Sequence, residues 1–402
     1  MSILIQRIVL LAGESSGDAI GEGLVREIKK QYPNSEIYGM GGDLMIQAGL
    51  KPWAHIDQLS VMGILEVVKK LPSILKLRKF LLQKIIKFKP DILIGIDSPD
   101  FNLWLEHKIK AQNNIPTIHY VSPTIWAWKP GRITKIMQAT SSVLCVFPFE
   151  PEIYQQAGHR AVFIGHPLAD QIAHADFVSP LVGETARQAA GLLGREGVMN
   201  HYFAILPGSR EFEIKNLLPI FLDSAAGLKK DFPDLKFVLP IARASLKNLI
   251  QEIITQAEIK HPNLINSIGL INNQAQQAFS ISKAAVLASG TITLEAALLN
   301  IPSVVAYRLS KFSYWLGKKL IKLKFISLPN ILLNQEVFKE LIQDDLTINN
   351  LYQAMRDSYL LGCENKTHDF SIKLKSMLID EHYSASQKAL QEIEHVLLNY
   401  RR

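Results

Sequence analysis

The sequence predicts two doubly wound α/β domains in tandem, each built on a parallel β-sheet. Three observations indicate this fold class. Short apolar runs rich in β-branched residues alternate with amphipathic helical stretches along residues 7–308. The 402 residues exceed what one hydrophobic core usually organises. Strand signals stop over 167–189 and then resume, which predicts a linker between the domains.

The composition is typical of a folded globular enzyme, with 48% hydrophobic and 20% charged residues. The two cysteines, Cys145 and Cys363, lie far apart and give no framework for disulfides or metal, so we expect a reducing cytoplasm. The apolar run at 7–12 flows into a Gly/Ser turn and is interpreted as a first strand, not a signal sequence. No run of 18 uncharged apolar residues occurs, so no transmembrane helix is predicted.

Five apolar runs predict the strands of the N-terminal domain, residues 1–167: RIVLLAG (7–13), DILIGID (91–97), TIHYVSP (117–123), SVLCVFPF (142–149) and AVFIGHP (161–167). Four runs predict those of the C-terminal domain, residues 168–346: YFAILPG (202–208), KFVLPIA (236–242), AAVLASG (284–290) and SVVAYR (303–308). Amphipathic patterns between them predict helices over 213–230 and 246–257. Residues 347–402 are helical and polar, and we expect them to pack back on the N-terminal domain.

Ligands of doubly wound sheets bind outside the carboxyl ends of the strands, so we expect a catalytic cleft between the domains there. The first strand is followed by a turn of small residues that lets a ligand approach the backbone, with an anion-favouring helix start behind it. Its spacing is not GxGxxG, which argues against a dinucleotide site. An ordinary capped turn is the equal alternative. The candidate substrate-binding residues are Gly13, Glu14, Ser15, Ser16, Gly17 and Asp18.

Two acidic residues follow the second predicted strand. Asp97 ends this apolar strand and is expected to point into the cleft, where a carboxylate can act as a general base. Asp100 lies where a helix N-cap is expected, with substrate binding as its second interpretation. His119 and His166 are interpreted as structural residues, and no metal or cofactor is predicted.

Ser209 and Arg210 follow the first strand of the C-terminal domain. A glycine turn with an arginine at a strand end can hold a phosphate by bidentate contacts. A surface arginine paired with Glu213 is the alternative.

The SGT turn of the C-terminal domain follows its third strand and precedes a helix. Backbone amides around Ser289, Gly290 and Thr291 are suited to a diphosphate. Glu295, one turn inside the helix, is suited to accept hydrogen bonds from ribose hydroxyls. A helix-start acid stabilised by the macrodipole is the alternative for Glu295.

Residues 61–90 combine many apolar residues with eight Lys or Arg and one acid. Pro72 predicts a short helix, a break and a second helix to about residue 88. This pattern favours binding to an anionic membrane surface, although a crossover helix packed on the sheet shares it. The candidate membrane-interface residues are Val67, Val68, Leu71, Leu75, Lys76 and Lys79.

A second stretch, 311–325, mixes aromatic residues and lysines without an acid. The sequence carries no nucleic-acid motif, so we predict a membrane partner and no nucleic acid.

Seven segments in this order resemble the lipid-A-disaccharide synthase family, which are inverting glycosyltransferases of the GT-B fold: AGESSGD (12–18), IGIDSPDF (94–101), YVSPTIWAWKPGRITKI (120–136), LPGSR (206–210), ASGTITLE (288–295), VVAYR (304–308) and SLPN (327–330). The resemblance covers essentially the whole chain. It implies UDP-2,3-diacylglucosamine as donor and 2,3-diacylglucosamine 1-phosphate as acceptor. The implied product is the β-1,6-linked lipid A disaccharide 1-phosphate, formed at the cytoplasmic face of the inner membrane of a Gram-negative cell.

The resemblance also implies roles for single residues. Asp97 would be the base, and Arg210 with the amides at 290–291 would offset the diphosphate charge without a metal. Asn330 would contact the nucleotide. The segment with Trp126 and Trp128 follows a strand on the same edge as Asp97, so we predict that it forms part of the acceptor-side wall, with Lys129 or Arg132 near an anionic group. Structural packing of at least one tryptophan is the equal alternative.

Two other functions stay open at this point. Another UDP-sugar enzyme, such as a different glycosyltransferase or a UDP-sugar 2-epimerase, predicts the same nucleotide site but has no need of the basic amphipathic surface. A non-enzymatic membrane or nucleic-acid binding module would retain only the fold. The sequence also leaves open the acyl-chain preference and whether the chain forms a homo-oligomer.

Overall fold

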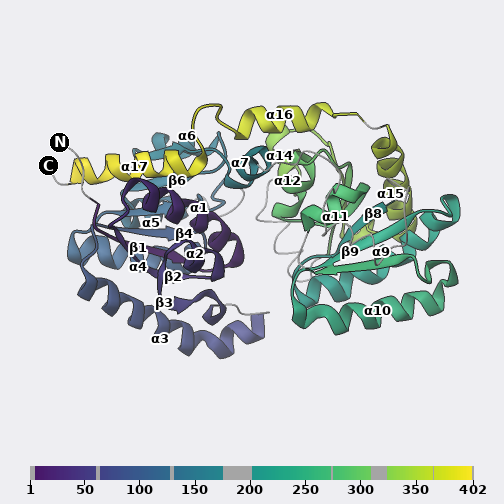
Figure 1. Ribbon diagram of the computed structural model, residues 1–402, viewed down its shortest axis with the longest axis horizontal. Helices are drawn as coiled ribbons and strands as arrows, with labels where there is room; N and C mark the ends of the chain where they lie inside the picture. Colours follow the sequence, from purple (N-terminus) through teal and green to yellow (C-terminus); the bar gives the residue numbers. More distant parts are fainter. Residues whose placement is uncertain are drawn as a thin grey trace. The chain divides into compact units, whose positions relative to one another are not determined.

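The computed structural model describes residues 5–59, 64–126, 131–174, 202–272, 275–308, 324–364 and 366–400. The chain divides into two compact units, one of Met1–Ala173 with Met377–Arg402 and the other of His174–Ser376. Each unit holds one parallel sheet with helices packed against it (Figure 1). The two sheets confirm the predicted fold class.

The sheet of unit 1 has seven parallel strands in the order β3-β2-β1-β4-β5-β6-β7. Their bounds are β1 Arg7–Ala12, β2 Glu36–Gly41, β3 Lys51–His55, β4 Ile92–Ile96, β5 Thr117–Tyr120, β6 Ser142–Cys145 and β7 Ala161–Phe163. All five residues of β4 are buried, as expected for a strand covered on both faces. The order reverses between β1 and β4, which makes their carboxyl ends the switch point of the sheet.

The helices of unit 1 are α1 Ser15–Gln31, α2 Asp43–Ala48, α3 Ile64–Phe88, α4 Pro99–Asn113, α5 Arg132–Ala139, α6 Glu150–Gln156, α7 Pro167–His174 and α17 Ala385–Tyr400. Apolar side chains of α3 and α4 pack on β1 and β4, where Leu81 and Leu105 join Val9 and Leu93 in one buried cluster. This packing buries one face of α3 and leaves the other to solvent.

The sheet of unit 2 has six parallel strands in the order β10-β9-β8-β11-β12-β13, so its switch point lies between β8 and β11. The strands are β8 Tyr202–Leu206, β9 Lys236–Ile241, β10 Ile268–Asn272, β11 Ser282–Ala288, β12 Ser303–Tyr307 and β13 Lys339–Ile342. The helices are α9 Glu211–Asp231, α10 Lys247–Lys260, α11 Ala275–Ile281, α12 Thr291–Leu298, α14 Leu328–Leu333 and α15 Ile348–Cys363, with α16 Asp369–Leu378 running from unit 2 into unit 1.

Two local predictions, those for Pro72 and for Asp100, are corrected by the structure. Pro72 does not break the helix, because α3 is continuous from Ile64 to Phe88. The proline is exposed, so the carbonyl that its missing N–H leaves unpaired can face water. The predicted linker region begins with α7, and its remainder from 175 onward lies outside the described residues. Helix α4 begins at Pro99 with Ser98 as its N-cap, so Asp100 is not the cap.

The C-terminal helices do not all pack on the N-terminal unit. Helix α15 packs on α9 and β11 within unit 2, whereas α17 packs on α1 within unit 1 (Figure 1). The buried Glu392 of α17 accepts two hydrogen bonds from Arg160, at 2.6 and 2.7 Å, and one from Ser142 at 2.6 Å. Unit 1 is therefore completed by a helix that follows unit 2 in the chain.

Candidate functional site

The switch point of unit 1 brings together the turns after β1 and β4. The strands pair in register up to Ala12 and Ile96. A Cβ built on Gly13 would lie 2.3 Å from Ser98 Oγ, so only glycine permits this approach of the two turns. The Oγ of Ser16, at the start of α1, lies 3.4 Å from Asp97 Oδ2. The first predicted substrate-binding turn and the predicted base thus meet at one edge of the sheet.

Asp97 is half-buried at the end of β4 and is held from both sides. Its N–H donates to the carbonyl of Tyr120 at 2.8 Å, and its own Oδ1 accepts from the N–H of Ser98 at 2.8 Å. Asp97 and Ser98 have φ values of 52° and 45°, and Val121 after β5 has 73°. Left-handed backbone at residues other than glycine, above all at a β-branched one, is strained and gathers at functional sites.

The turn after β1 divides into an exposed and a buried part. Glu14, Ser15 and Ser16 are exposed, whereas Gly17 and Asp18 are buried. The carboxylate of Asp18 accepts hydrogen bonds from the backbone of α2 and its N-cap, from the N–H groups of residues 42, 44 and 45 at 2.7, 3.1 and 3.2 Å. The prediction that Asp18 binds substrate is therefore corrected, because its oxygens hold the start of α2.

The tryptophan segment after β5 is anchored at Trp126 to the start of α6. The indole N–H donates to the buried carboxyl of Glu150 at 3.1 Å, and the ring packs edge-on against Phe149. Arg132 forms an ion pair with the exposed carboxylate of Asp100. The pairing joins two predicted substrate-binding residues of α4 and α5. Lys129 lies outside the described residues.

Arg210 of unit 2 is the N-cap of α9, at the end of the turn that follows β8. The Oε2 of Glu213 accepts from the backbone N–H groups of Ser209 and Arg210 at 3.0 and 3.2 Å, and Arg210 Nη1 lies 3.5 Å from Glu213 Oε1. The amides of this turn are therefore occupied. The guanidinium remains 66% exposed, so the side chain, and not these amides, is available to an anion.

Gly290 and Thr291 start α12 at the other side of the unit 2 switch point. A Cβ built on Gly290 would have no heavy atom within 4 Å, and both residues are exposed. Glu295 follows one turn later, and burial raises the pKa of its carboxyl, partly offset by a hydrogen bond with Gln276. The hydroxyl of Ser289 donates to the carbonyl of Ile326 at 3.3 Å.

Asn330 is fully buried in α14, so its predicted nucleotide contact is corrected. Its Nδ2 donates to Phe338 O at 2.7 Å and to Glu340 Oε1 at 2.9 Å. Its Oδ1 accepts from the N–H groups of Val337 and Phe338, both at 2.9 Å. These four hydrogen bonds fasten α14 to β13 and to the two residues before it.

Three residues near the two switch points were missed by sequence reasoning. They are Ser98, which meets Gly13, Gln276, which meets Glu295, and Tyr307, which ends β12. Burial raises the pKa of Tyr307, and the charge of Glu213 raises it further, whereas the charge of Arg210 lowers it. Tyr307 therefore lies close to the pair of Arg210 and Glu213. Ser98 and Tyr307 sit within the strand-end motifs, so position after a strand was a usable signal for both.

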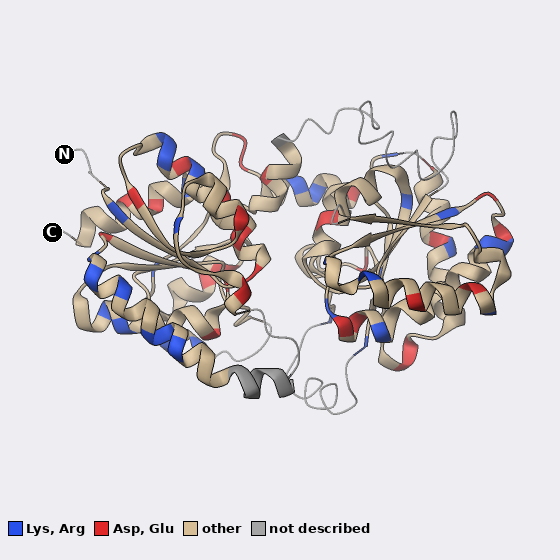
Figure 2. Cartoon of the chain, turned by 60° about the horizontal axis from the view of Figure 1, so that its bottom comes forward, with Lys and Arg blue, Asp and Glu red and all other residues tan. Residues whose placement is uncertain are grey.

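Helix α3 presents apolar and basic side chains to solvent. Leu71 and Leu75 are 48% and 51% exposed, and Lys76 and Lys79 are exposed beside them. Lys and Arg colour much of this helix blue in Figure 2. Nearby on α4, Trp104 is 38% exposed beneath the guanidinium of Arg78. The side chains of Val67 and Val68, and residues 311–323 of the second basic stretch, lie outside the described residues.

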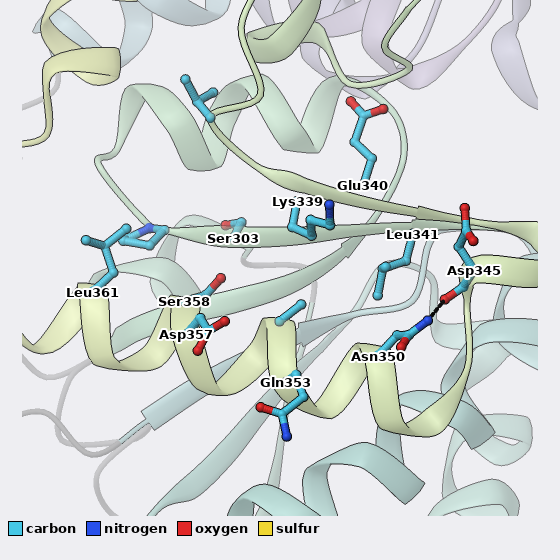
Figure 3. A pocket seen from close by; sticks show the side chains of 13 residues that line it. Ser303, Lys339, Glu340, Leu341, Asp345, Asn350, Gln353, Asp357, Ser358 and Leu361 are labelled. Carbon is cyan, nitrogen blue, oxygen red and sulfur yellow. Dashed lines mark hydrogen bonds between the residues drawn. The ribbon is translucent and has the colours of Figure 1, made fainter.

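A hollow of about 640 Å³ lies between the edge strand β13 and α15 of unit 2 (Figure 3). Its lining includes Lys339, Asn350 and Asp357, and none of the predicted site residues. We assign it no role, because it lies beside the sheet edge and not at the switch point.

The described ranges hold neither a candidate metal cluster nor a candidate membrane-spanning helix. No three His, Cys, Asp or Glu side chains in them are grouped so that they could hold a metal ion. No helix in the described part of the chain is long and apolar enough to cross a membrane.

Solved structures with little sequence identity share the fold. The UDP-GlcNAc 2-epimerase from Neisseria meningitidis bound to UDP-GlcNAc superposes with a TM-score of 0.62 at 13% identity, covering 97% of this chain and 100% of that chain. Acinetobacter baumannii MurG gives a TM-score of 0.52 at 13% identity, covering 97% and 99%. These neighbours show the GT-B-like fold alone.

Sequence relatives are much closer. Lipid-A-disaccharide synthase of Psychromonas ingrahamii is 41% identical over 396 residues, covering 98% of this chain and 98% of that protein. The enzyme of the same name from Haemophilus influenzae is 42% identical over 381 residues, covering 95% and 92%. The family model described as Lipid-A-disaccharide synthetase matches residues 8–393. The chain therefore belongs to the lipid-A-disaccharide synthase family.

Proposed function

We propose that this glycosyltransferase transfers the sugar of UDP-2,3-diacylglucosamine to the 6-hydroxyl of 2,3-diacylglucosamine 1-phosphate, with Asp97 as the general base. One observation carries the proposal. Asp97 ends β4 at the switch point of unit 1, with Oδ1 bound by the Ser98 N–H and Oδ2 facing the exposed hydroxyl of Ser16. One carboxylate oxygen is fixed by a hydrogen bond, and the other faces the exposed turn after β1. This arrangement suits a general base, whose free oxygen must point at the hydroxyl proton that it removes.

The reaction is a single in-line displacement. The 6-oxygen of the acceptor attacks the anomeric carbon of the donor as the bond from that carbon to the diphosphate oxygen breaks. The hydroxyl proton passes to Asp97, and UDP leaves with the bonding electron pair. Attack from the face opposite to UDP inverts the anomeric centre, which gives the β-1,6 linkage.

Residues of unit 2 are suited to the leaving group. The exposed guanidinium of Arg210 can pair with diphosphate oxygens, and the open helix start at Gly290 and Thr291 offers backbone amides and a dipole of the right sign. We expect Glu295, one turn inside α12, to accept hydrogen bonds from the ribose hydroxyls. Donors fixed before the reaction stabilise developing charge without reorganisation.

Acceptor-dependent release of UDP tests the proposal. Purified chain is mixed with both substrates in mixed micelles with EDTA present, and UDP is followed with time. We expect Asp97→Asn to lower kcat by about 10²–10⁴-fold while UDP binding stays unchanged. The matched control is Asp91→Asn. Asp91 precedes β4 and accepts hydrogen bonds from the backbone N–H groups of residues 6 and 7, at the end of the sheet opposite to Asp97.

Other results would point elsewhere. Full activity of Asp97→Asn would remove Asp97 as the base. Conversion of the UDP-sugar without any acceptor would support the 2-epimerase alternative, and UDP binding without turnover would overturn the choice of substrates.

We further propose that α3 docks on the cytoplasmic face of the inner membrane. Its exposed leucines match acyl chains, and its lysines match anionic headgroups. Both proposed substrates carry acyl chains, so such docking would bring the switch point of unit 1 to the lipid surface. A homo-oligomer stays an open prediction.

A further inference from the structure

We infer that Asn102 is a positioning residue for the reaction, which fixes the direction of the Asp97 carboxylate by holding the peptide between Asp97 and Ser98. The inference rests on the proposed role of Asp97. Asn102 lies in the first turn of α4, is fully buried and touches no residue of unit 2 in any described hydrogen bond.

The side-chain nitrogen of Asn102 faces three backbone carbonyls at the carboxyl ends of β1 and β4. It lies 2.8 Å from the oxygen of Asp97, 3.0 Å from that of Leu11 and 3.2 Å from that of Ile96. These carbonyls lie where the two strands end and their ladder of hydrogen bonds stops. One carboxamide therefore ties together the two strands of the switch point.

The peptide between Asp97 and Ser98 transmits this contact to the carboxylate. Its carbonyl oxygen accepts from Asn102, and its N–H donates to Asp97 Oδ1 at 2.8 Å. Both atoms belong to the same planar group, so fixing one fixes the other. A rotation of this peptide would carry the N–H away from Oδ1 and release the carboxylate.

Backbone strain favours rotation of the peptide between Asp97 and Ser98. Asp97 and Ser98 both have left-handed backbone, a conformation that is strained for residues other than glycine. The hydrogen bond from Asn102 opposes that relaxation. Gly13 restricts it further, because this residue packs against Ser98 with no space for a Cβ.

The interior makes room for Asn102 at Gly95 of β4. A Cβ on Gly95 would lie 2.8 Å from Asn102 Cβ and 2.1 Å from Glu106 Oε1. Glu106 lies one turn further along the same face of α4 and contacts His119 Nδ1 at 2.9 Å. It is equally buried and polar, but its described contacts do not include Asp97. Glu106 therefore supplies a matched control.

The test compares kcat and KM for three variants, with each substrate varied in turn while the other is saturating. Asn102→Leu keeps the approximate size and removes both N–H donors. It also removes Asn102 Oδ1, which has no hydrogen-bond partner in the described structure, so part of the loss of stability is offset. We expect kcat to fall about 10- to 100-fold with KM for both substrates changed less than about twofold, because a misplacement near 1 Å has this effect.

Asn102→Asp is the second variant, and it decides the matter if the leucine variant does not fold. A carboxyl buried among carbonyls takes up a proton and offers one donor in place of two, so kcat should fall by an intermediate factor. Glu106→Gln should lower the unfolding temperature and leave kcat unchanged.

Three results would overturn the inference: an unchanged kcat in a folded Asn102 variant, a change confined to KM, or an equal fall of kcat in Glu106→Gln. Asp97→Asn, measured in parallel, separates the two proposals. An active Asp97→Asn refutes the base itself. An inactive Asp97→Asn with fully active Asn102 variants refutes only the positioning role.

Discussion

Glu150 is a buried carboxyl that joins the tryptophan segment to the end of β6. It accepts hydrogen bonds from the indole of Trp126 and from the N–H of Phe147, both at 3.1 Å. Burial raises the pKa of Glu150 from 4.5 to about 7, because the charged form loses more hydration than these donors replace.

This raised pKa predicts a pH-dependent stability. Between about pH 4.5 and 7 the folded chain binds more protons than the unfolded chain, so the unfolding free energy falls as the pH rises. We expect Glu150 to contribute a loss of roughly 3 kcal/mol across this window, complete above pH 7. Urea unfolding followed by tryptophan fluorescence measures it, because four of the five tryptophans, Trp53, Trp104, Trp126 and Trp128, belong to unit 1.

Glu150→Gln is the comparison that isolates this group. The variant should become more stable relative to the natural chain as the pH rises from about 4.5 to 7. A difference in unfolding free energy that does not change with pH would contradict the assignment. Other carboxylates titrate equally in both proteins and cancel in this difference.

Single residues show what the sequence can and cannot predict at a site. Asp97 was placed correctly at the end of β4, because a strand end is a local feature of the sequence. Asp18 and Asn330 lie in equally suggestive motifs, yet both are used to fasten backbone. Their partners lie up to 27 and 10 residues away, and only the folded chain shows that these partners satisfy them.

Among the elements, α3 makes the clearest prediction. Leu71→Glu combined with Leu75→Glu should lower binding to anionic phospholipid vesicles by at least about 10-fold, because two apolar contacts are lost and two repelled charges are added. Co-sedimentation with the vesicles measures this, and circular dichroism checks the fold. Neither leucine belongs to a buried core cluster, so stability should change little.

The matched control for α3 is a pair of exposed isoleucines in unit 2. Ile259 and Ile265 are 77% and 52% exposed, and Ile259→Glu with Ile265→Glu should leave vesicle binding unchanged. Equal losses in both double variants would show that charge alone governs binding and that α3 has no special part in it.

The elements that escaped sequence analysis are mostly the outer strands. Strands β3, β10 and β13 lie at sheet edges, and β2 lies next to one. Edge strands need no continuous apolar run, because solvent covers part of them. Thus β3 contains Pro52, and β13 reads KELI. The strands at both switch points are buried on both faces, and their apolar runs identified them.

At the scale of the whole molecule, unit 1 depends on the ion pair between Arg160 and Glu392. We expect Arg160→Met to lower the unfolding free energy of unit 1 by about 2 kcal/mol, because it leaves a buried carboxylate with fewer partners, while the partial exposure of Arg160 limits the loss. Thermal unfolding followed by circular dichroism measures this effect, because the helices of both units contribute to the signal.

A surface ion pair of unit 2 serves for comparison. Arg356 Nε lies 3.2 Å from Asp231 Oδ2, with both side chains about as exposed as Arg160. Arg356→Met should change stability by less than about 1 kcal/mol. If the two variants lose equal stability, burial of Glu392 does not matter and the account of α17 is wrong.

The position of α17 also bears on how the chain is made. A ribosome delivers residues in order, so β1 to α7 emerge long before the helix that packs on α1. Unit 2 is continuous from His174 to Ser376 and can complete its core during synthesis. Unit 1 stays incomplete until α17 leaves the exit tunnel. Until then, Ser142 and Arg160 lack their partner Glu392, and part of α1 is uncovered. Unit 1 is thus translated before unit 2 but finished after it.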